Sequence, residues 1–138
     1  MGFPKGQELT FKYEYDFAVS GGAVSSIALV NKGVNALEAG LIISDFTVHF
    51  ETAFAGTATP VLLLGNAGDV DGYSVDFYAK TSVLNRGELA GALVWDDAND
   101  AALYYKIGSA ADAIPRLDIS VQALTAGKFT VYFKAMRP

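Results

Sequence analysis

The chain has 138 residues, a net charge of −5 and no cysteine, and 51% of its residues are hydrophobic while only 18% are charged. This balance excludes an intrinsically disordered chain, which would be poor in apolar residues and rich in charge. Without cysteine there is no disulfide or thiolate chemistry, and the single His49 excludes a multi-histidine metal centre. The acidic charge argues against binding nucleic acid through its phosphates. A chain of this length predicts one domain.

The first eight residues predict an extended arm. Pro4 and Gly6 disfavour regular structure there, while Phe3 is an apolar side chain with no strand of its own to pack in. We therefore expect an arm over residues 1–8 and a single folded domain over residues 9–138. The arm lacks the apolar stretch of a signal peptide, and no run of the chain approaches the ~20 apolar residues that span a bilayer. We expect no membrane partner.

Alternation with period two is the strongest pattern in the first half of the chain. Residues 9–17 place five large apolar or aromatic side chains on one face of a strand, with polar residues between them. Residues 25–30 and 42–51 predict two further strands. The third strand has one apolar face, formed by Ile42, Phe46, Val48 and Phe50. Residues 59–64 are apolar on both faces, which predicts a strand inside a sheet with Pro60 at its start.

The second half continues the pattern. Residues 73–78 alternate, whereas residues 79–91 lack strand character and could hold a short helical turn. Residues 92–95 and 103–107 predict two strands, joined by the turn-forming residues 96–100.

The last part of the chain predicts a hairpin. Leu117, Ile119, Val121 and Ala123 share one face, residues 125–128 form a turn, and residues 129–135 return with matching alternation. We expect both arms of this hairpin to lie in one sheet.

These strands define the expected fold. Eight or nine short strands are separated by turns, and no window has the 3.6-residue period of a helix. The sequence therefore predicts an all-β protein, a single-domain antiparallel β-sandwich, of which the jelly roll is one form.

The sequence contains few residues or motifs that point to catalysis. His49 could act as a base, and Asp45 and Glu51 fall on the same side of its strand. The favoured interpretation is a surface position on the polar face, without chemistry. The chain has neither the Gly-x-Ser-x-Gly elbow of a hydrolase nor a phosphate-binding loop, so we expect no catalytic residue and no enzymatic activity.

Two acidic loops resemble calcium ligands only in part. Asp69 and Asp71 precede Gly72, but Tyr78 stands where a calcium loop needs a glutamate. A second loop also contains aspartates, which commonly form turns without metal. We expect no metal and no cofactor, and the residues that would bind calcium if either loop did are Asp69, Asp71, Asp96, Asp97 and Asp100.

Hydrophobicity predicts self-association. A mean hydropathy of +0.28 with few charges is high for a monomer, which indicates apolar surface covered by a partner. We expect an oligomer, with a trimer favoured over a dimer. Aromatic residues and the chain ends supply the expected interface, namely Phe3, Pro4, Tyr13, Tyr15, Met136 and Arg137.

Three segments carry a resemblance to a known class of protein. They are Phe-Ala-Val-Ser-Gly-Gly-Ala-Val at 17–24, Leu-Glu-Ala-Gly-Leu-Ile-Ile at 37–43, and residues 48–65 with Thr-Ala-Phe-Ala-Gly-Thr-Ala-Thr at 52–59. Together they resemble small structural proteins of tailed bacteriophage virions, of the head decoration, cement or fibre type. The resemblance spans residues 9–80 and rests on turn and strand residues. The chain departs from that pattern in a shortened turn at 55–58.

The resemblance implies a non-enzymatic protein of the capsid surface, present in many copies and made in the host cytoplasm. Its implied partners are copies of itself and a major capsid protein. A second hypothesis stays open, that of a carbohydrate- or receptor-binding β-sandwich module of a fibre or spike. In that case Trp95 and the tyrosines would form a stacking platform, with Trp95 exposed in a groove.

Overall fold

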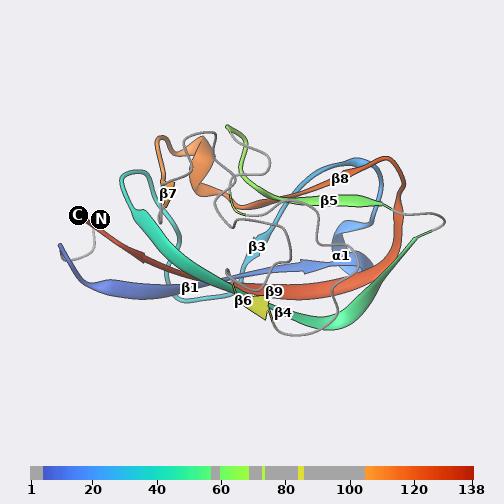
Figure 1. The fold of residues 1–138 in the computed structure, drawn as a ribbon, viewed down its shortest axis with the longest axis horizontal. Helices are drawn as coiled ribbons and strands as arrows, with labels where there is room; N and C mark the ends of the chain where they lie inside the picture. Colours follow the sequence, from blue (N-terminus) through green and yellow to red (C-terminus); the bar gives the residue numbers. More distant parts are fainter. Residues whose placement is uncertain (1–4, 57–59, 69–72, 74–83, 86–104) are drawn as a thin grey trace.

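The computed structural model describes residues 5–56, 60–68, 73, 84–85 and 105–138. The strands of this part pair antiparallel and form two sheets, which lie over one another as the layers of a sandwich (Figure 1). The predicted all-β sandwich is therefore confirmed. The jelly-roll form stays a prediction, because several of the expected strands lie outside the described residues.

The large sheet has the strand order β3-β1-β9-β4-β6, and β7 also pairs with β4. Its strands are β1 (Glu8–Asp16), β3 (Val30–Asn31), β4 (Ile42–Gly56), β6 (Leu84–Asn85), β7 (Tyr105–Lys106) and β9 (Leu124–Met136). The alternation of residues 9–17 correctly located β1 and its inward face, where Phe11, Tyr13 and Tyr15 are buried. β6 lies within residues 79–91, where no strand was expected, and β7 lies within the strand expected at 103–107.

The small sheet has the order β2-β8-β5, formed by β2 (Ser25–Ala28), β5 (Val61–Gly65) and β8 (Arg116–Ser120). Pro60 immediately precedes β5, as predicted. β5 pairs with β8 on one side, and on the other side the Leu64 carbonyl accepts a hydrogen bond from the Tyr73 N–H at 2.9 Å. Within the described residues β5 is the last strand in this order, so its expected place inside a sheet stays a prediction.

The expected strand over residues 25–30 is two strands in two sheets. β2 pairs with β8 in the small sheet, whereas β3 pairs with β1 in the large one. Between them lies Leu29, which is buried, and its N–H donates to the Pro115 carbonyl at 2.9 Å. The chain crosses between layers at this residue because Leu29 turns into the core.

The prediction that Ile42 shares the inward face of β4 with Phe46 is wrong. Ile43 is fully buried, while Ile42 is only half-buried. The pairing with β9 shifts between Ile43 and Asp45, so that Ser44 is an extra residue in β4. A bulge of this kind reverses which residues face the core on its two sides, so the alternation that places Phe46 inward cannot be extended back to Ile42.

The predicted hairpin over residues 117–135 is wrong, because its two arms belong to different sheets. β8 pairs with β2 and β5, and β9 pairs with β1 and β4. Between them the Gln122 N–H donates to the Ser120 carbonyl at 2.8 Å across Val121, which has a φ of 72°. This tight three-residue turn is strained for a β-branched residue, and it redirects the chain from one layer to the other.

β9 begins earlier than expected and includes the residues predicted as a turn. Gly127 has a φ of 148°, and a Cβ at this position would overlap the Phe54 ring. The pairing of β4 with β9 shifts several times here, where both strands curve upward toward the small sheet (Figure 1). Glycine is therefore required for the close approach of Phe54 at this corner.

One short helix and one turn complete the described chain. The helix α1 (Phe17–Ser20) begins where the Asp16 side chain accepts a hydrogen bond from the Ala18 N–H at 3.0 Å, which ends β1 one residue before the predicted limit. A 3₁₀ turn, η2 (Ala111–Ala113), precedes β8. The strands expected at 92–95 and, beyond Tyr73, at 73–78 lie outside the described residues, as does the loop at 96–100.

Candidate functional site

His49 has no catalytic partner among the described residues. It lies exposed on β4, opposite Thr130 of β9, on the outer face of the large sheet. Glu51 accepts a hydrogen bond from the Thr130 hydroxyl at 3.3 Å and pairs with Lys128 instead. Asp45 accepts a hydrogen bond from the next backbone N–H at 2.8 Å. The carboxylates expected beside His49 are thus engaged elsewhere, and His49 is a surface residue, as predicted.

The aspartates named as calcium candidates are not placed by the structure. Asp69, Asp71, Asp96, Asp97 and Asp100 lie outside the described residues. In the part of the chain that is described, no three His, Asp or Glu side chains lie close enough together to bind a metal ion. The functional features of the described residues are therefore the charged and polar contacts on the surface of the domain.

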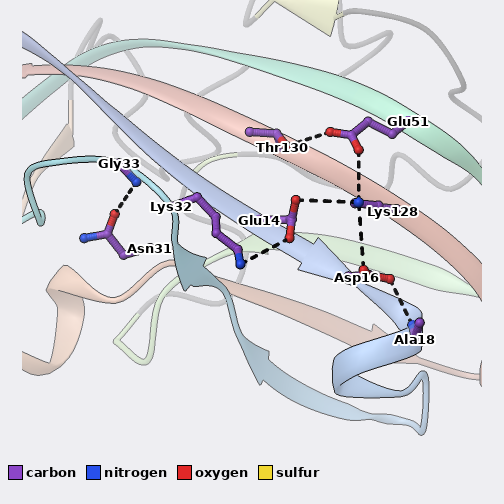
Figure 2. A network of polar contacts seen from close by, with 9 residues as sticks. All are labelled: Glu14, Asp16, Ala18, Asn31, Lys32, Gly33, Glu51, Lys128 and Thr130. Atoms are coloured by element: carbon purple, nitrogen blue, oxygen red, sulfur yellow. Dashed lines mark hydrogen bonds and ion pairs between the residues drawn. The ribbon is translucent and has the colours of Figure 1, made fainter.

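The outer face of the large sheet carries a network of charges centred on Lys128 (Figure 2). The Lys128 Nζ lies 3.3 Å from a carboxylate oxygen of Glu51 on β4, and 4.0 and 3.9 Å from those of Glu14 and Asp16 on β1. Lys32, which follows β3, pairs with Glu14 at 3.9 Å. One ammonium on β9 thus connects the two strands that flank it.

The electrostatics of this network follow from its excess of carboxylates. The pKa of Lys128 is raised above its usual value by the hydrogen bond to Glu51 and by the charge of the same group, with Glu14 adding to the effect. Asp16 also caps α1, so its carboxylate has two roles. Exposed pairs of this kind stabilise a protein only modestly, and their effect falls with salt.

Two further contacts cover the same face nearer the chain ends. The Lys12 Nζ lies 5.8 Å from the centre of the Tyr132 ring, a cation–π contact between β1 and β9. The Ser44 hydroxyl donates to the Glu8 carboxylate at 3.0 Å, from β4 across to β1. The outer face is therefore polar and of mixed sign over the whole width of its three long strands.

The two ends of the described chain lie side by side at one end of the sandwich (Figure 1). Lys5 forms a parallel bridge with Arg137, and the Gly6 N–H donates to the Arg137 carbonyl at 2.7 Å. The Arg137 guanidinium pairs with the Glu38 carboxylate. Arg137 is thus bound within its own chain, and Met136 is half-buried. Phe3 and Pro4 lie outside the described residues.

The structure corrects two of the predicted interface residues. Tyr13 and Tyr15 belong to the core, at 4% and 1% exposure. The Tyr13 hydroxyl accepts a hydrogen bond from the Leu37 N–H at 2.9 Å, and the Tyr15 hydroxyl donates to the Gly21 carbonyl at 2.6 Å. Their hydroxyls are satisfied internally, so a neighbouring subunit is not needed to bond them.

Burial also controls the ionisation of these two tyrosines. Burial raises the pKa of Tyr15 to about 12, and the charge of Asp16 acts in the same direction. Burial likewise raises the pKa of Tyr13, against an opposing hydrogen bond from the Leu37 N–H. Both residues are structural, and both are neutral over the physiological range.

Sequence reasoning missed the exposed apolar side chains. Val19, Val24 and Val121 are 75%, 54% and 68% exposed. Val24 and Val121 flank the pair formed by β2 and β8, and Val19 lies on α1 at the same end of the sandwich, far from the chain termini (Figure 1). No pattern in the sequence predicts this, because Val19 comes from α1 and the other two valines come from two separate connections.

The platform of the carbohydrate-binding hypothesis is not placed by the structure. Trp95 lies outside the described residues. Of the tyrosines described in full, Tyr13, Tyr15 and Tyr73 are buried, and Tyr132 lies beside Lys12. No described residue therefore favours this hypothesis. Within the described chain, no helix is long and apolar enough to cross a membrane.

Comparison with known proteins relates the fold to one solved structure. No family model and no curated protein sequence matches the chain. Among solved structures, a chain of the "Cyanophage Pam1 capsid asymmetric unit" is similar with a TM-score of 0.63 and 17% sequence identity. The match covers 100% of this chain and 93% of that chain. The chain is thus similar in fold to a chain of a cyanophage capsid, and the two chains are of similar extent.

Proposed function

We propose that this chain is a non-enzymatic structural protein of a bacteriophage virion, which decorates or cements the capsid in many copies. The observation that carries the proposal is the match over the full chain to a similarly sized chain of a cyanophage capsid. The described surface supports it, because charges and apolar side chains are present without a catalytic constellation. A protein of this kind acts on the outside of the particle and is made in the host cytoplasm.

The proposed partners are a major capsid protein and identical copies of this chain. Composition favours a trimer, since a small apolar domain leaves apolar surface for its neighbours. The exposed valines Val19, Val24 and Val121 supply part of that surface.

We propose that the chain divides into an arm, residues 1–8, and a domain, residues 9–138. We propose further that the arm attaches the domain to the particle. Phe3 and Pro4 are its proposed apolar anchor, and Met136 and Arg137 lie at the end of the domain where Lys5 and Gly6 are placed. The contact of Gly6 with Arg137 supports this, because it positions the arm next to the last strand.

The proposed function is tested with purified particles of the phage that encodes the chain. We expect the chain at a copy number set by the capsid symmetry, and density for its sandwich on the capsid surface in a particle reconstruction. Particles assembled without the chain would rupture at a lower temperature. Absence of the chain from mature particles would contradict the proposal.

The role of the arm is tested by deleting residues 1–4, which removes Phe3 and Pro4 but keeps Lys5 and Gly6 beside Arg137. We expect an unchanged melting temperature of the free protein and a lower occupancy when particles lacking the chain are decorated in vitro. The substitution Phe3→Ala should reproduce most of the loss, and Lys5→Ala is the matched control. Wild-type occupancy of the truncated chain would refute this role.

A further inference from the structure

The two sheets differ in how one outer edge of each is protected. In the small sheet, β2 pairs with β8 on one side only within the described residues, and its other edge carries the backbone groups of Ser26. The Arg116 guanidinium covers that edge, because it donates to the Ser26 hydroxyl at 2.8 Å and to the Ser26 carbonyl at 3.0 Å. A charged side chain over a strand edge prevents another strand from pairing there.

The edge of β1 in the large sheet is protected over only half of its length. β3 pairs with Tyr13 and Glu14, and the last contact is the Lys32 N–H, which donates to the Lys12 carbonyl at 2.8 Å. Backbone groups alternate in direction along a strand, so those of Glu8 and Thr10 point to the same side as those of Lys12. Both residues are exposed, and within the described residues no strand pairs with them on this side.

The side chains near this edge do not cover it. The Glu8 carboxylate accepts its hydrogen bond from Ser44 on β4, which lies on the far side of β9. The Lys12 ammonium lies over Tyr132, also toward β9. Both charged side chains therefore lean inward over the sheet, and neither covers the backbone of residues 8–10, which no strand of the described residues pairs on this side.

We propose that this edge pairs with the same edge of a second copy of the chain, antiparallel across a two-fold axis centred on Leu9. In that register Glu8 lies opposite Thr10 of the second copy and Thr10 opposite its Glu8, so each outward N–H meets an outward carbonyl. Leu9 faces its own symmetry mate as a non-hydrogen-bonded pair, in which side chains approach most closely. Leu9 is half-buried beside the core, so the contact would also cover its exposed part.

A second copy fits this edge better than a strand of another protein. The open edge is short, because the chain turns away at Gly6, and Lys32 and Gly33, which follow β3, lie against Lys12. A longer strand would meet Lys32 and Gly33, whereas the strand of the second copy stops where its own chain turns away at Gly6. Across the axis, each Glu8 gains Lys12 of the second copy as a diagonal neighbour, giving two unlike-charge diagonals against one between the two Glu8 residues.

The pairing does not depend on the proposed virion function, and it is compatible with a trimer, whose subunits could pair with those of the next trimer. The chain contains no cysteine, so a disulfide can report the contact. In Leu9→Cys, the Cα atoms across a non-hydrogen-bonded pair would be ~4.5 Å apart, within the reach of a disulfide. Under mild oxidation we expect most of this variant to become a covalent dimer.

Two controls distinguish pairing from collision. Glu8→Cys lies opposite Thr10 rather than opposite itself, and Val34→Cys lies on a fully exposed loop residue. Both should cross-link at least tenfold more slowly than Leu9→Cys. Equal rates for the three variants would overturn the proposal, since Leu9 would then have no special proximity to its mate.

A second pair of variants avoids any change near the core. Thr10→Pro removes an N–H that points away from β9 and also fixes φ at this position, whereas Thr10→Ala retains the N–H. A contact this small associates weakly, so sedimentation is measured at protein concentrations up to about 1 mM. We expect Thr10→Ala to associate like the wild type and Thr10→Pro to associate at least tenfold more weakly. Equal association of the two variants would contradict the register, and a wild type without association at the highest concentration would refute the contact.

Discussion

The two sheets fill one core with different side chains. The large sheet contributes aromatic rings, among them Phe129, whose ring centre lies 5.7 Å from that of Tyr15, 6.0 Å from Phe50 and 5.8 Å from Phe54. The small sheet contributes aliphatic side chains, with Leu62, Leu64, Leu117 and Ile119 fully or almost fully buried. The rings of one layer thus pack over branched aliphatic groups of the other.

Their outer surfaces differ as well. The large sheet presents a network of mixed charges around Lys128, while the small sheet has Arg116 over the edge of β2. The large sheet has more paired strands and the wider charged face, and its edge at β1 is where we propose lateral contact. Each of the following predictions tests one part of this contrast.

Loss of an aromatic side chain should have the largest effect. Phe129→Ala removes the ring at the centre of the aromatic cluster, and we expect the free energy of unfolding to fall by about 3–5 kcal/mol. Leu117→Ala is the matched variant in the small sheet, with an expected loss of about 2–4 kcal/mol. Urea unfolding followed by circular dichroism measures both. A larger loss for Leu117→Ala would reverse the proposed contribution of the two layers.

The corner between the sheets should be the next most sensitive position. Gly127→Ala introduces a Cβ that overlaps the Phe54 ring at a positive φ, so we expect a loss of about 2–4 kcal/mol. Gly40→Ala is the control, because Gly40 also has a positive φ, of 92°, but no atom within 4 Å of the new Cβ. Its expected loss is about 1 kcal/mol. Similar losses would mean that the approach of Phe54 contributes nothing.

High pH should weaken the large sheet through Tyr15. Its pKa rises from 10.0 in the unfolded chain to about 12 in the folded one, so folding favours the neutral phenol. The resulting stability is complete below pH 10 and is lost as the pH rises toward 12, by up to roughly 2 kcal/mol. In Tyr15→Phe, the decline of unfolding free energy over this range should be smaller. An identical decline in both proteins would show that Tyr15 does not cause it.

The smallest effect is expected from the charge network. Lys128→Met removes the cation among Glu14, Asp16 and Glu51, so the urea midpoint should fall slightly at low salt and approach the wild-type value at high salt. Lys134→Met is the control on the same strand and face, with no ion pair in the described structure. If both substitutions behave alike at every salt concentration, the network does not stabilise the sheet.

The sequence predicted the fold class and much of the large sheet. Alternation alone located β1, the inward face of β9 and the middle of β4, because a strand with one face in the core repeats every two residues. It also predicted His49 as a surface residue. It could not locate the exposed valines or the open edge of β1, since both depend on where other segments end.

What the sequence determined by itself is therefore local, namely which residues are extended and which side of each strand is apolar. The tertiary structure alone decided which sheet a strand joins. β8 and β9 have matching alternation because the two layers of a sandwich face one core and require the same pattern. The turn at Val121 nevertheless sends the two strands into opposite layers, which the alternation cannot predict. For the same reason Tyr13 and Tyr15, amphipathic enough for an interface, are core residues whose hydroxyls bond to Leu37 and Gly21.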